Sequence, residues 1–366
     1  MTGPGRHVVM TADAIGGVWT YALDLGAALV RRGDRVTLAV LGPDPTAAQR
    51  ADAAARGLAV TGLGHPPEWL AADAGAVRAG GDALFRLADQ ENADLLHLNH
   101  PALAAEVAFD CPTLAVAHSC LATWWEAVRG DEPLPDDFRW RTELHEAGLA
   151  AADALAAPSA AFAEATRRVY GFGTAPLVVP NGRDAAEPAA AAPPAPSVLT
   201  AGRLWDEGKN LAVLDRAAAR LPVAVEAAGP LDGPNGARIV LHHTVALGSL
   251  DAGVLRARLA ARPIFASTAL YEPFGLSVLE AAQAGCALVL SDIPTFRELW
   301  DDAALFVAPH DDRALAAAVL RLLGDRADRA ERAALCAGRA ARYTVDAMAD
   351  ATLKAHAAAA LAHRGR

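Results

Sequence analysis

The stretch LYEPFGLSVLEAAQAG, residues 270–285, places two glutamates, Glu272 and Glu280, on either side of an apolar run that contains one glycine. It follows PIFAST (263–268), which is typical of a buried strand, and the apolar spacing after Gly275 predicts a helix. A glycine at a helix start allows close approach to free backbone N–H groups, which together with the helix dipole favour an anion. The sequence therefore places one carboxylate just before an anion-binding helix start and a second about two turns along the helix.

A carboxylate beside an anion site suits a ligand that is anionic in one part and rich in hydroxyls in another. A nucleoside diphosphate sugar has both parts. Its diphosphate would bind the backbone N–H groups, while the carboxylates accept hydrogen bonds from sugar and ribose hydroxyls. Taken alone, the two glutamates are also consistent with exposed charges on a loop and on a helix surface.

A second stretch, TAGRLWDEGKN (200–210), also lies at the end of a predicted strand. Gly202 permits a turn, and Arg203 and Lys209 follow it six residues apart. The chain contains only two lysines, its other basic residues being arginine, so a lysine here indicates that a compact ammonium matters. Arg203 and Lys209 would hold a diphosphate from one side while the amides of residues 274–276 hold it from the other. The alternative is two surface cations on a polar loop.

Short apolar runs alternate with helical patterns in both halves of the chain. In the first half we predict strands at 7–12, 35–41, 93–99, 113–119, 152–159 and 177–182, helices at 19–33, 100–109 and 160–171, and a long polar and aromatic loop over 118–140. In the second half we predict strands at 197–203, 223–229, 238–247, 263–268 and 287–292, helices at 210–221, 253–262 and 275–285, and a helical tail after 311. Such alternation is typical of α/β domains with parallel sheets covered by helices.

The chain is long enough for two such domains. The Pro- and Ala-rich segment 187–197 is typical of a surface connection near a domain boundary. We therefore predict a doubly wound, Rossmann-like N-terminal domain over 1–186, a second one over 187–345, and a C-terminal helix over 346–366 that returns to the first domain. Ligands of open parallel sheets bind beyond the carboxyl ends of the strands, so a cleft between two facing domains is the expected site.

These motifs resemble those of the retaining glycosyltransferases of family 4, which have the two-domain GT-B fold. EPFGLSVLE (272–280) resembles the E-x7-E signature of that family, and AGRLWDEGKN (201–210) resembles its Arg…Gly-Lys-Asn segment. VVPNG (178–182) resembles the strand end before the interdomain linker, and GGVWTYALDLGAAL (16–29) the N-terminal glycine loop and first helix. The resemblance covers residues 7–345 and implies the GT-B fold for this chain.

The resemblance also implies roles for individual residues. Glu272 would contact hydroxyls of the transferred sugar, and Glu280 would hold the nucleotide ribose. Arg203 and Lys209 would bind the diphosphate, and His118 would reach the donor sugar from the N-terminal domain. Glu272, Arg203, Lys209 and His118 are thus the predicted catalytic residues. The other implied donor contacts are Gly16, Gly17, Gly202, Phe274, Gly275, Leu276 and, for the base, residues 247–251.

The sequence predicts catalysis without a metal ion. No two aspartates are separated by a single residue, so the chain lacks a D-x-D motif. Arg203, Lys209 and the helix N-terminus would neutralise the charge of the diphosphate instead. A site formed by His97, His100 and His118 is the alternative, but no other ligand spacing supports it. We expect no cofactor beyond the donor substrate, a UDP- or GDP-sugar. By resemblance, the acceptor hydroxyl attacks from the side that the diphosphate leaves, a phosphate oxygen takes its proton, and the anomeric configuration is retained.

The acceptor is predicted from aromatic residues. Trp19 lies near the glycine loop, and Trp124 and Trp125 lie in the aromatic segment; their faces suit a sugar, a glycoside or another small acceptor. The alternative is that these tryptophans only pack the segment against the protein. No basic amphipathic helix indicates a lipid acceptor, so we expect a soluble one. Nothing in the sequence indicates the oligomeric state.

Composition excludes several other classes of partner. A net charge of −10 argues against nucleic acid and against docking on anionic lipid. No run approaches the ~20 apolar residues of a membrane span, and the N-terminus does not resemble a signal peptide. The four cysteines have no C-x-x-C spacing, which favours free thiols in a reducing cytoplasm.

Three rival functions differ in what they require. A nucleotide-sugar epimerase of GT-B fold would consume the donor with no acceptor present. A catalytically inactive family member acting as a binding partner would not need Glu272, Glu280, Arg203 and Lys209, which are all intact. A two-domain solute-binding protein would need a secretory signal, which the sequence does not show.

Overall fold

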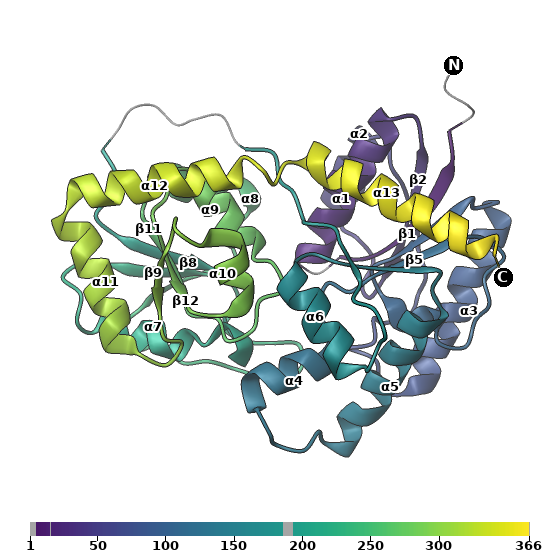
Figure 1. The fold of residues 1–366 in the computed structure, drawn as a ribbon, viewed down its shortest axis with the longest axis horizontal. Coiled ribbons are helices and arrows are strands. Elements are labelled where there is room, and N and C mark those ends of the chain that lie inside the picture. The colour runs from purple at the N-terminus through teal and green to yellow at the C-terminus, as the bar shows by residue number, and fades with distance from the viewer. Residues whose placement is uncertain (1–4, 15, 186–192, 366) are drawn as a thin grey trace. The chain divides into compact units, whose positions relative to one another are not determined.

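The computed structural model describes residues 5–14, 16–185 and 193–365, and the chain divides into two compact units (Figure 1). Unit 1 is formed by Met1–Glu126, Asp131–Gly182 and Val345–Arg366, and unit 2 by Ala127–Gly130 and Arg183–Thr344. The predicted boundary at 186/187 and residues 187–192 of the predicted connection lie outside the described residues, so that boundary stays a prediction.

Unit 1 contains a seven-stranded parallel sheet in the order β3-β2-β1-β4-β5-β6-β7. The strands are β1 (His7–Asp13), β2 (Arg35–Leu41), β3 (Ala59–Gly62), β4 (Leu95–Leu98), β5 (Thr113–Val116), β6 (Ala154–Ala157) and β7 (Leu177–Val178). Every residue of β1 is buried, as expected for a central strand covered on both faces. In the register of the sheet, Val8 pairs with Val36 on one side and with Leu95 on the other.

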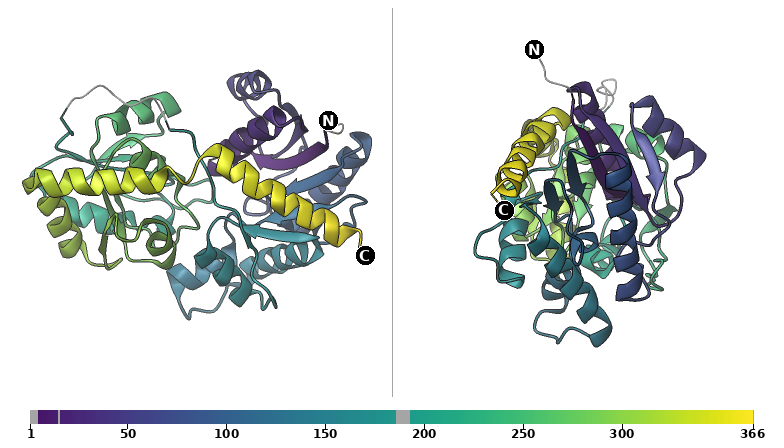
Figure 2. Two further views of the ribbon diagram at one scale, coloured as in Figure 1. Left: turned by 45° about the horizontal axis from the view of Figure 1, so that its top comes forward. Right: turned by 90° about the vertical axis from the view of Figure 1, so that its right-hand side faces the viewer.

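The helical segments of unit 1 are α1 (Gly17–Arg31), α2 (Ala47–Ala55), α3 (Ala74–Gln90), the 3-10 turn η1 (Pro101–Ala104), α4 (Leu121–Arg129), α5 (Asp136–Ala151), α6 (Ala160–Val169) and α13 (Val345–His363); the end of α4 groups with unit 2. Helix α13 packs along α1 and across β5 and β6 (Figures 1 and 2). Its first turns place Val345 and Met348 in the core beside α1, and Ala355 and Ala359 pack against β5 and β6. The predicted return of the C-terminal helix to the first domain is confirmed.

Unit 2 contains a six-stranded parallel sheet in the order β10-β9-β8-β11-β12-β13. The strands are β8 (Val198–Ala201), β9 (Val225–Ala228), β10 (Val245–Gly248), β11 (Ile264–Ser267), β12 (Leu288–Ser291) and β13 (Leu305–Val307). The helical segments are η2 (Glu207–Lys209), α7 (Leu211–Ala218), α8 (Ala252–Ala260), α9 (Leu276–Gln283), α10 (Pro294–Trp300), α11 (Asp312–Gly324) and α12 (Arg326–Ala340).

Strand residues of unit 2 alternate between two cores. Phe265 joins the cluster with α9, α10 and α12, whereas its neighbours Ile264 and Ala266 join the cluster with α7 and α11. This period of two is the reason that helices are needed on both faces of the sheet.

Three predicted elements were wrong: the helix over 100–109, the loop over 118–140 and the strand over 238–247. Of residues 100–109, only 101–104 are helical, as the short turn η1. The buried residues of η1 pack against α5 so closely that a Cβ at Gly148 would lie 1.9 Å from the Pro101 carbonyl oxygen. The predicted loop over 118–140 contains α4 and the start of α5; Asp136 and Asp137 in the first turn of α5 are a helix-start signal that sequence reasoning missed.

The predicted strand over 238–247 begins only at Val245. The backbone N–H groups of His242, His243 and Thr244 bind the carboxylate of Asp215 instead of a neighbouring strand. Several elements had no prediction, namely β3, β13, α2, α3 and α10. No helix within the described ranges is long and apolar enough to cross a membrane.

Candidate donor site at the carboxyl edge of unit 2

Each sheet reverses its strand order once, between β1 and β4 in unit 1 and between β8 and β11 in unit 2. Such a reversal leaves a crevice beyond the carboxyl ends of the strands, which is where doubly wound sheets bind ligands. In unit 2 this reversal lies between loop 202–210, which follows β8, and loop 268–275, which follows β11. These two loops contain most of the donor-site residues predicted from the sequence.

Backbone hydrogen bonds hold the two loops together. The carbonyl oxygen of Gly208 accepts from the N–H groups of Leu270 and Tyr271, at 2.8 and 3.2 Å. The Thr268 hydroxyl donates to the carbonyl of Asn210 at 3.0 Å, and the Asn210 side-chain amide donates back to the carbonyl of Thr268 at 3.0 Å. Asn210 adopts a left-handed conformation with φ of 50°, which asparagine tolerates better than most residues. Sequence reasoning did not single out Asn210 or Thr268.

These hydrogen bonds between the two loops bring Lys209 and Glu272 together. The Lys209 Nζ lies 2.5 Å from Oε2 of Glu272, and the two side chains are 23% and 13% exposed. A charge-assisted contact of this kind is stronger than a hydrogen bond between neutral groups. The carboxyl edge of this sheet therefore presents a positive and a negative group at one point, which suits a ligand that carries both phosphates and hydroxyls.

Arg203 has a different partner. Its guanidinium lies 3.3 Å from Asp206 and 5.8 Å from the centre of the Trp205 ring, and its side chain is 47% exposed. Asp206 also accepts the Gly208 N–H at 2.9 Å, which caps η2. Asp206 thus links Arg203 to the turn that carries Lys209.

The start of α9 requires a glycine. Gly275 has φ of +92°, and a Cβ there would lie 3.3 Å from both Cγ of Glu272 and Cε1 of Phe296. Phe274 is 2% exposed and packs edge-on against Tyr343, so its backbone is the part that a ligand can contact. Leu276 packs against the same core cluster.

The turn after β8 has an equally tight contact. A Cβ on Gly229, at the end of β9, would lie 1.8 Å from the carbonyl oxygen of Gly202. Gly229 has φ of +143° and was missed by sequence reasoning, although its place directly after a predicted strand is the signal that identifies it. A side chain at Gly229 would displace the turn that leads to Arg203.

Glu280 lies within α9 and pairs with a residue that the sequence did not suggest. Its Oε1 is 2.9 Å from Nε of Arg183, and the side chains are 26% and 17% exposed. Arg183 directly follows the VVPNG segment. The structure therefore brings Lys209 to Glu272 and Arg183 to Glu280, and gives Arg203 a separate partner.

Unit 1 also carries polar residues at its strand reversal. The Asn99 side-chain amide donates to the Thr11 carbonyl at 2.7 Å, and Nε2 of His118 lies 2.8 Å from Oδ1 of Asn99. Nε2 of His100 lies 3.1 Å from the Asp13 carboxylate. Asp13 thus ends β1, and Asn99 and His118 follow β4 and β5 at the same edge of the sheet. Sequence reasoning found His118 but not Asp13 or Asn99.

The glycine loop precedes α1 at the same edge. Gly16 is exposed, with φ of +98°, and caps the helix, while Gly17 begins it.

Burial lowers the pKa of His118 to about 3, so its imidazole is neutral at physiological pH and acts through hydrogen bonding, not through charge. The Tyr21 ring packs edge-on against it at 4.4 Å.

His97 belongs to a buried chain of polar groups behind this edge. Its Nδ1 lies 3.0 Å from Nε2 of His356 on α13, and its Nε2 lies 3.2 Å from the Tyr21 hydroxyl. His97, His100 and His118 each bond to other protein groups. Among the residues that the structure describes, no group of three or more His, Cys, Asp or Glu side chains is placed to hold a metal ion.

The buried His356 predicts that acid destabilises the protein. Burial, with a smaller contribution from the positive charge of Arg6, lowers the pKa of His356 to about 3 in the folded protein, whereas an unfolded histidine titrates near ~6.5. The unfolded state therefore binds more protons between these values, so the stabilising contribution is complete above pH ~6.5 and is lost as the pH falls towards 3. From pH 8 to pH 5 we expect about 2 kcal/mol less free energy of unfolding from this group.

Urea unfolding at both pH values measures this loss. His356→Gln should unfold with a shallower pH dependence than wild type. The exposed His310, replaced in the same way, should leave the dependence as it is. Equal pH dependence in His356→Gln and wild type would contradict this account of the buried pair.

The tryptophans differ in exposure. Trp19 is only 7% exposed and lies in the core of unit 1, so it offers little surface to an acceptor. The Trp125 indole N–H donates to the carbonyl of Glu132 at 2.7 Å and its ring packs edge-on against Phe138, so it ties α4 to α5. Trp124 packs beside Trp125, and both are partly exposed. A role for Trp124 and Trp125 in acceptor binding stays a prediction.

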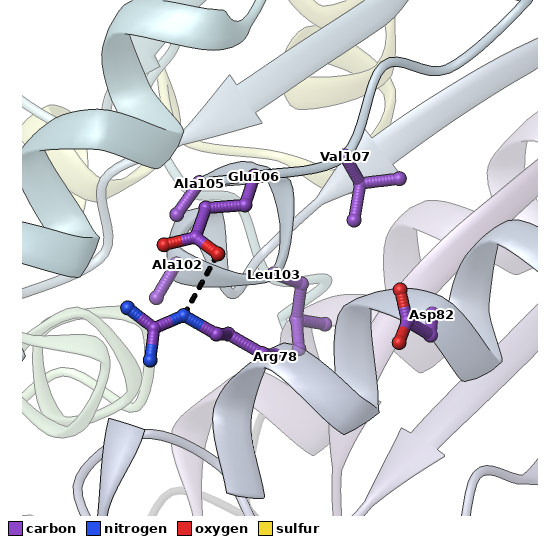
Figure 3. Close-up of a pocket in the computed structure, with 7 residues that line it drawn as sticks. All are labelled: Arg78, Asp82, Ala102, Leu103, Ala105, Glu106 and Val107. Atoms are coloured by element: carbon purple, nitrogen blue, oxygen red, sulfur yellow. Dashed lines mark ion pairs between the residues drawn. The ribbon is translucent and has the colours of Figure 1, made fainter. Parts of the chain in front are cut away.

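A cavity of about 170 Å³ lies in unit 1 between α3 and the segment that includes η1 (Figure 3). Arg78 and Glu106 form an ion pair of 2.8 Å beside it. Its lining residues are Arg78, Asp82, Ala102, Leu103, Ala105, Glu106 and Val107. None of them is a predicted site residue, so this cavity has no part in the donor site described above.

Comparison with known proteins agrees with this geometry. The model described as Glycosyltransferase Family 4 matches residues 15–187, and the model described as Glycosyl transferases group 1 matches residues 195–325. Together with two parallel α/β domains, these matches support a glycosyltransferase of the GT-B fold. The expected fold is confirmed.

Individual relatives are similar over nearly the whole chain. Glycogen synthase of Mycobacterium tuberculosis is 29% identical over 87% of this chain and 85% of its own length. Among solved structures, sucrose-phosphate synthase from Thermosynechococcus elongatus has a TM-score of 0.77 at 20% identity, and Anabaena HepE in complex with UDP-glucose has 0.74 at 18%. In both cases the match covers 95% of this chain and 98% of the other. At these identities the solved structures show the fold alone.

Proposed function

We propose that this protein transfers a sugar from a nucleoside diphosphate sugar to a hydroxyl acceptor, with retention of the anomeric configuration and without a metal ion. The observation that carries this proposal is the contact between Lys209 and Glu272 at the crevice between β8 and β11. Glu280 lies on the helix that begins at the same crevice. The residue proposed to neutralise phosphate and the one proposed to accept sugar hydroxyls are thus on adjoining loops, and the one proposed to accept ribose hydroxyls is on the helix that follows.

A UDP-sugar is the donor that we propose first, with a GDP-sugar as the second choice. The UDP-glucose complex of HepE supports UDP, and the similarity to a glycogen synthase supports glucose as the first sugar to test. The acceptor is a carbohydrate, a glycoside or another small hydroxyl compound.

The proposed chemistry begins with departure of the diphosphate. Lys209 and the N–H groups at the start of α9 stabilise the negative charge that builds on it as the bond from the anomeric carbon to phosphate oxygen breaks. Glu272 accepts hydrogen bonds from sugar hydroxyls, and neutral His118 hydrogen-bonds the same sugar. The acceptor oxygen bonds to the anomeric carbon from the side that the diphosphate leaves, and its proton passes to a phosphate oxygen.

Activity is expected to survive chelation. The chain lacks a D-x-D motif, and Lys209 with a helix N-terminus supplies positive charge at the crevice. Transfer measured after dialysis against EDTA should match the untreated rate. Loss of activity that Mg²⁺ or Mn²⁺ restores would show that a metal neutralises the diphosphate.

A thermal-shift screen across UDP, GDP and ADP sugars tests the proposal without knowledge of the acceptor. A ligand present at 100 times its dissociation constant adds about 2.7 kcal/mol to the free energy of unfolding. One nucleotide class should raise the melting temperature, and the free diphosphate of that class should do so as well. No shift with any of these ligands would contradict the proposed function.

A further inference from the structure

We propose that Arg183 is a positioning residue for nucleotide binding: it holds the carboxylate of Glu280 in the orientation that accepts ribose hydroxyls. The inference rests on the proposed function, because it deepens the role given to Glu280. It starts from the ion pair of 2.9 Å between Nε of Arg183 and Oε1 of Glu280. Both side chains are largely buried, so solvent screens the pair less than it would a surface pair.

The backbone of Arg183 is fixed from two sides. Its N–H donates to the carbonyl of Tyr343 at 3.0 Å, and its carbonyl accepts from Nε2 of Gln283 at 2.7 Å. Gln283 lies three residues after Glu280 on α9, and residues at this spacing share one face of a helix. One face of α9 therefore holds Arg183 twice, through the side chain by Glu280 and through the backbone by Gln283.

This arrangement favours positioning over mere anchoring. A guanidinium is planar and donates in fixed directions, so a carboxylate paired with it has few orientations left. A carboxylate can accept about four hydrogen bonds, so Glu280 is able to bind Arg183 and ribose hydroxyls at the same time. Arg183 also offsets the negative charge of Glu280, which otherwise would repel a nucleoside diphosphate.

Two nucleotides separate positioning from a structural role. UDP and 2′,3′-dideoxy-UDP differ only in the ribose hydroxyls that Glu280 is proposed to bind. Wild type should bind UDP at least tenfold more tightly, since a hydrogen bond to a charged group accounts for roughly that ratio or more. In Arg183→Gln we expect UDP to lose about tenfold in affinity and the dideoxy nucleotide to lose little, so that the ratio between them collapses.

Matched variants complete the experiment. Arg321→Gln removes another ion-paired arginine of unit 2, which pairs with Asp328 at 2.7 Å and is 56% exposed, and it should bind both nucleotides as wild type does. The double variant Arg183→Gln with Glu280→Gln should lose little more UDP affinity than Glu280→Gln alone, because positioning acts only through Glu280. Calorimetric titration measures all of these affinities.

Each outcome has a distinct meaning. An Arg183→Gln protein that keeps the wild-type ratio overturns the inference, whether it binds UDP normally or loses both nucleotides equally. If Arg183→Gln fails to fold by circular dichroism, Arg183→Lys replaces it; an unchanged ratio there, where the planar fork is lost, also overturns the inference. If UDP, GDP and ADP all fail to bind wild type, the proposed function itself has failed.

Discussion

Replacing Lys209 by alanine is expected to lower the turnover of sugar transfer by about 10²–10³-fold, with a smaller change in donor affinity. Charge builds on the diphosphate only as it leaves, so a cation beside it stabilises the transition state more than the bound donor. The hydrogen bonds that join loop 202–210 to loop 268–275 hold Lys209 beside Glu272, where we propose that the diphosphate binds. Steady-state kinetics with the donor varied measures both quantities.

The variant has a complication that a second substitution resolves. Without Lys209, the Glu272 carboxylate loses its partner at 2.5 Å and would repel the donor. The double variant Lys209→Ala with Glu272→Gln removes that repulsion. If its turnover stays low, the cause is either the lost cation or the lost sugar contact. Comparison with Glu272→Gln alone separates these two causes. Lys354→Ala is the matched control, because Lys354 is the only other lysine and lies exposed on α13.

Arg203→Ala should change kinetics in the same sense as Lys209→Ala. Arg203 pairs with Asp206 and is about half exposed, so part of its guanidinium remains open to a ligand. Unchanged turnover with a raised Michaelis constant, in either the Lys209 or the Arg203 variant, would mean that the residue binds only the ground state.

The second large effect is a split between the two glutamates. Glu272→Gln should impair turnover and weaken discrimination between sugar epimers, while affinity for the free nucleoside diphosphate changes little. The reason is that Glu272 lies beside Lys209 before the helix start, where the sugar would follow the phosphate. Glutamine keeps the shape but replaces a charged acceptor by a neutral amide.

Glu280→Gln should instead weaken the free diphosphate, because ribose hydroxyls are present with or without the sugar. Hydrogen bonds to a charged group contribute roughly 1.5–3 kcal/mol, which is about tenfold or more in affinity. Calorimetric titration of both variants with the cognate diphosphate decides the assignment. Loss of affinity in Glu272→Gln and not in Glu280→Gln would reverse it. If neither variant changed donor binding or turnover, neither glutamate would belong to the donor site.

Much of the fold followed from local patterns. Buried strands such as 35–41 and 287–292 were predicted because parallel strands covered on both faces are continuously apolar. The start of α5 was missed although its signal is local, whereas the wrong strand over 238–247 depends on a contact distant in sequence. Residues 242–244 have the sequence pattern of a strand, but their backbone N–H groups donate hydrogen bonds to the Asp215 carboxylate. No local sequence pattern predicts that contact.

The candidate site divides in the same way. Glu272, Lys209 and Gly275 stand in short motifs whose chemistry is local, so the sequence singled them out as candidates, and the structure brings Lys209 and Glu272 into contact. The ion pair between Arg183 and Glu280 joins residues nearly one hundred positions apart, and the packing of Gly229 on Gly202 depends on sheet register. Sequence reasoning also gave Trp19 an exposed role because of its place beside a glycine loop, whereas its ring lies in the core.

The most direct test of the donor site is a crystal structure of the protein with the nucleoside diphosphate that gives the largest thermal shift. The account predicts diphosphate oxygens within hydrogen-bond distance of the N–H groups at the start of α9 and of Lys209, with the ribose hydroxyls at Glu280. A nucleotide bound elsewhere, for example in the cavity beside Arg78 and Glu106, would contradict it.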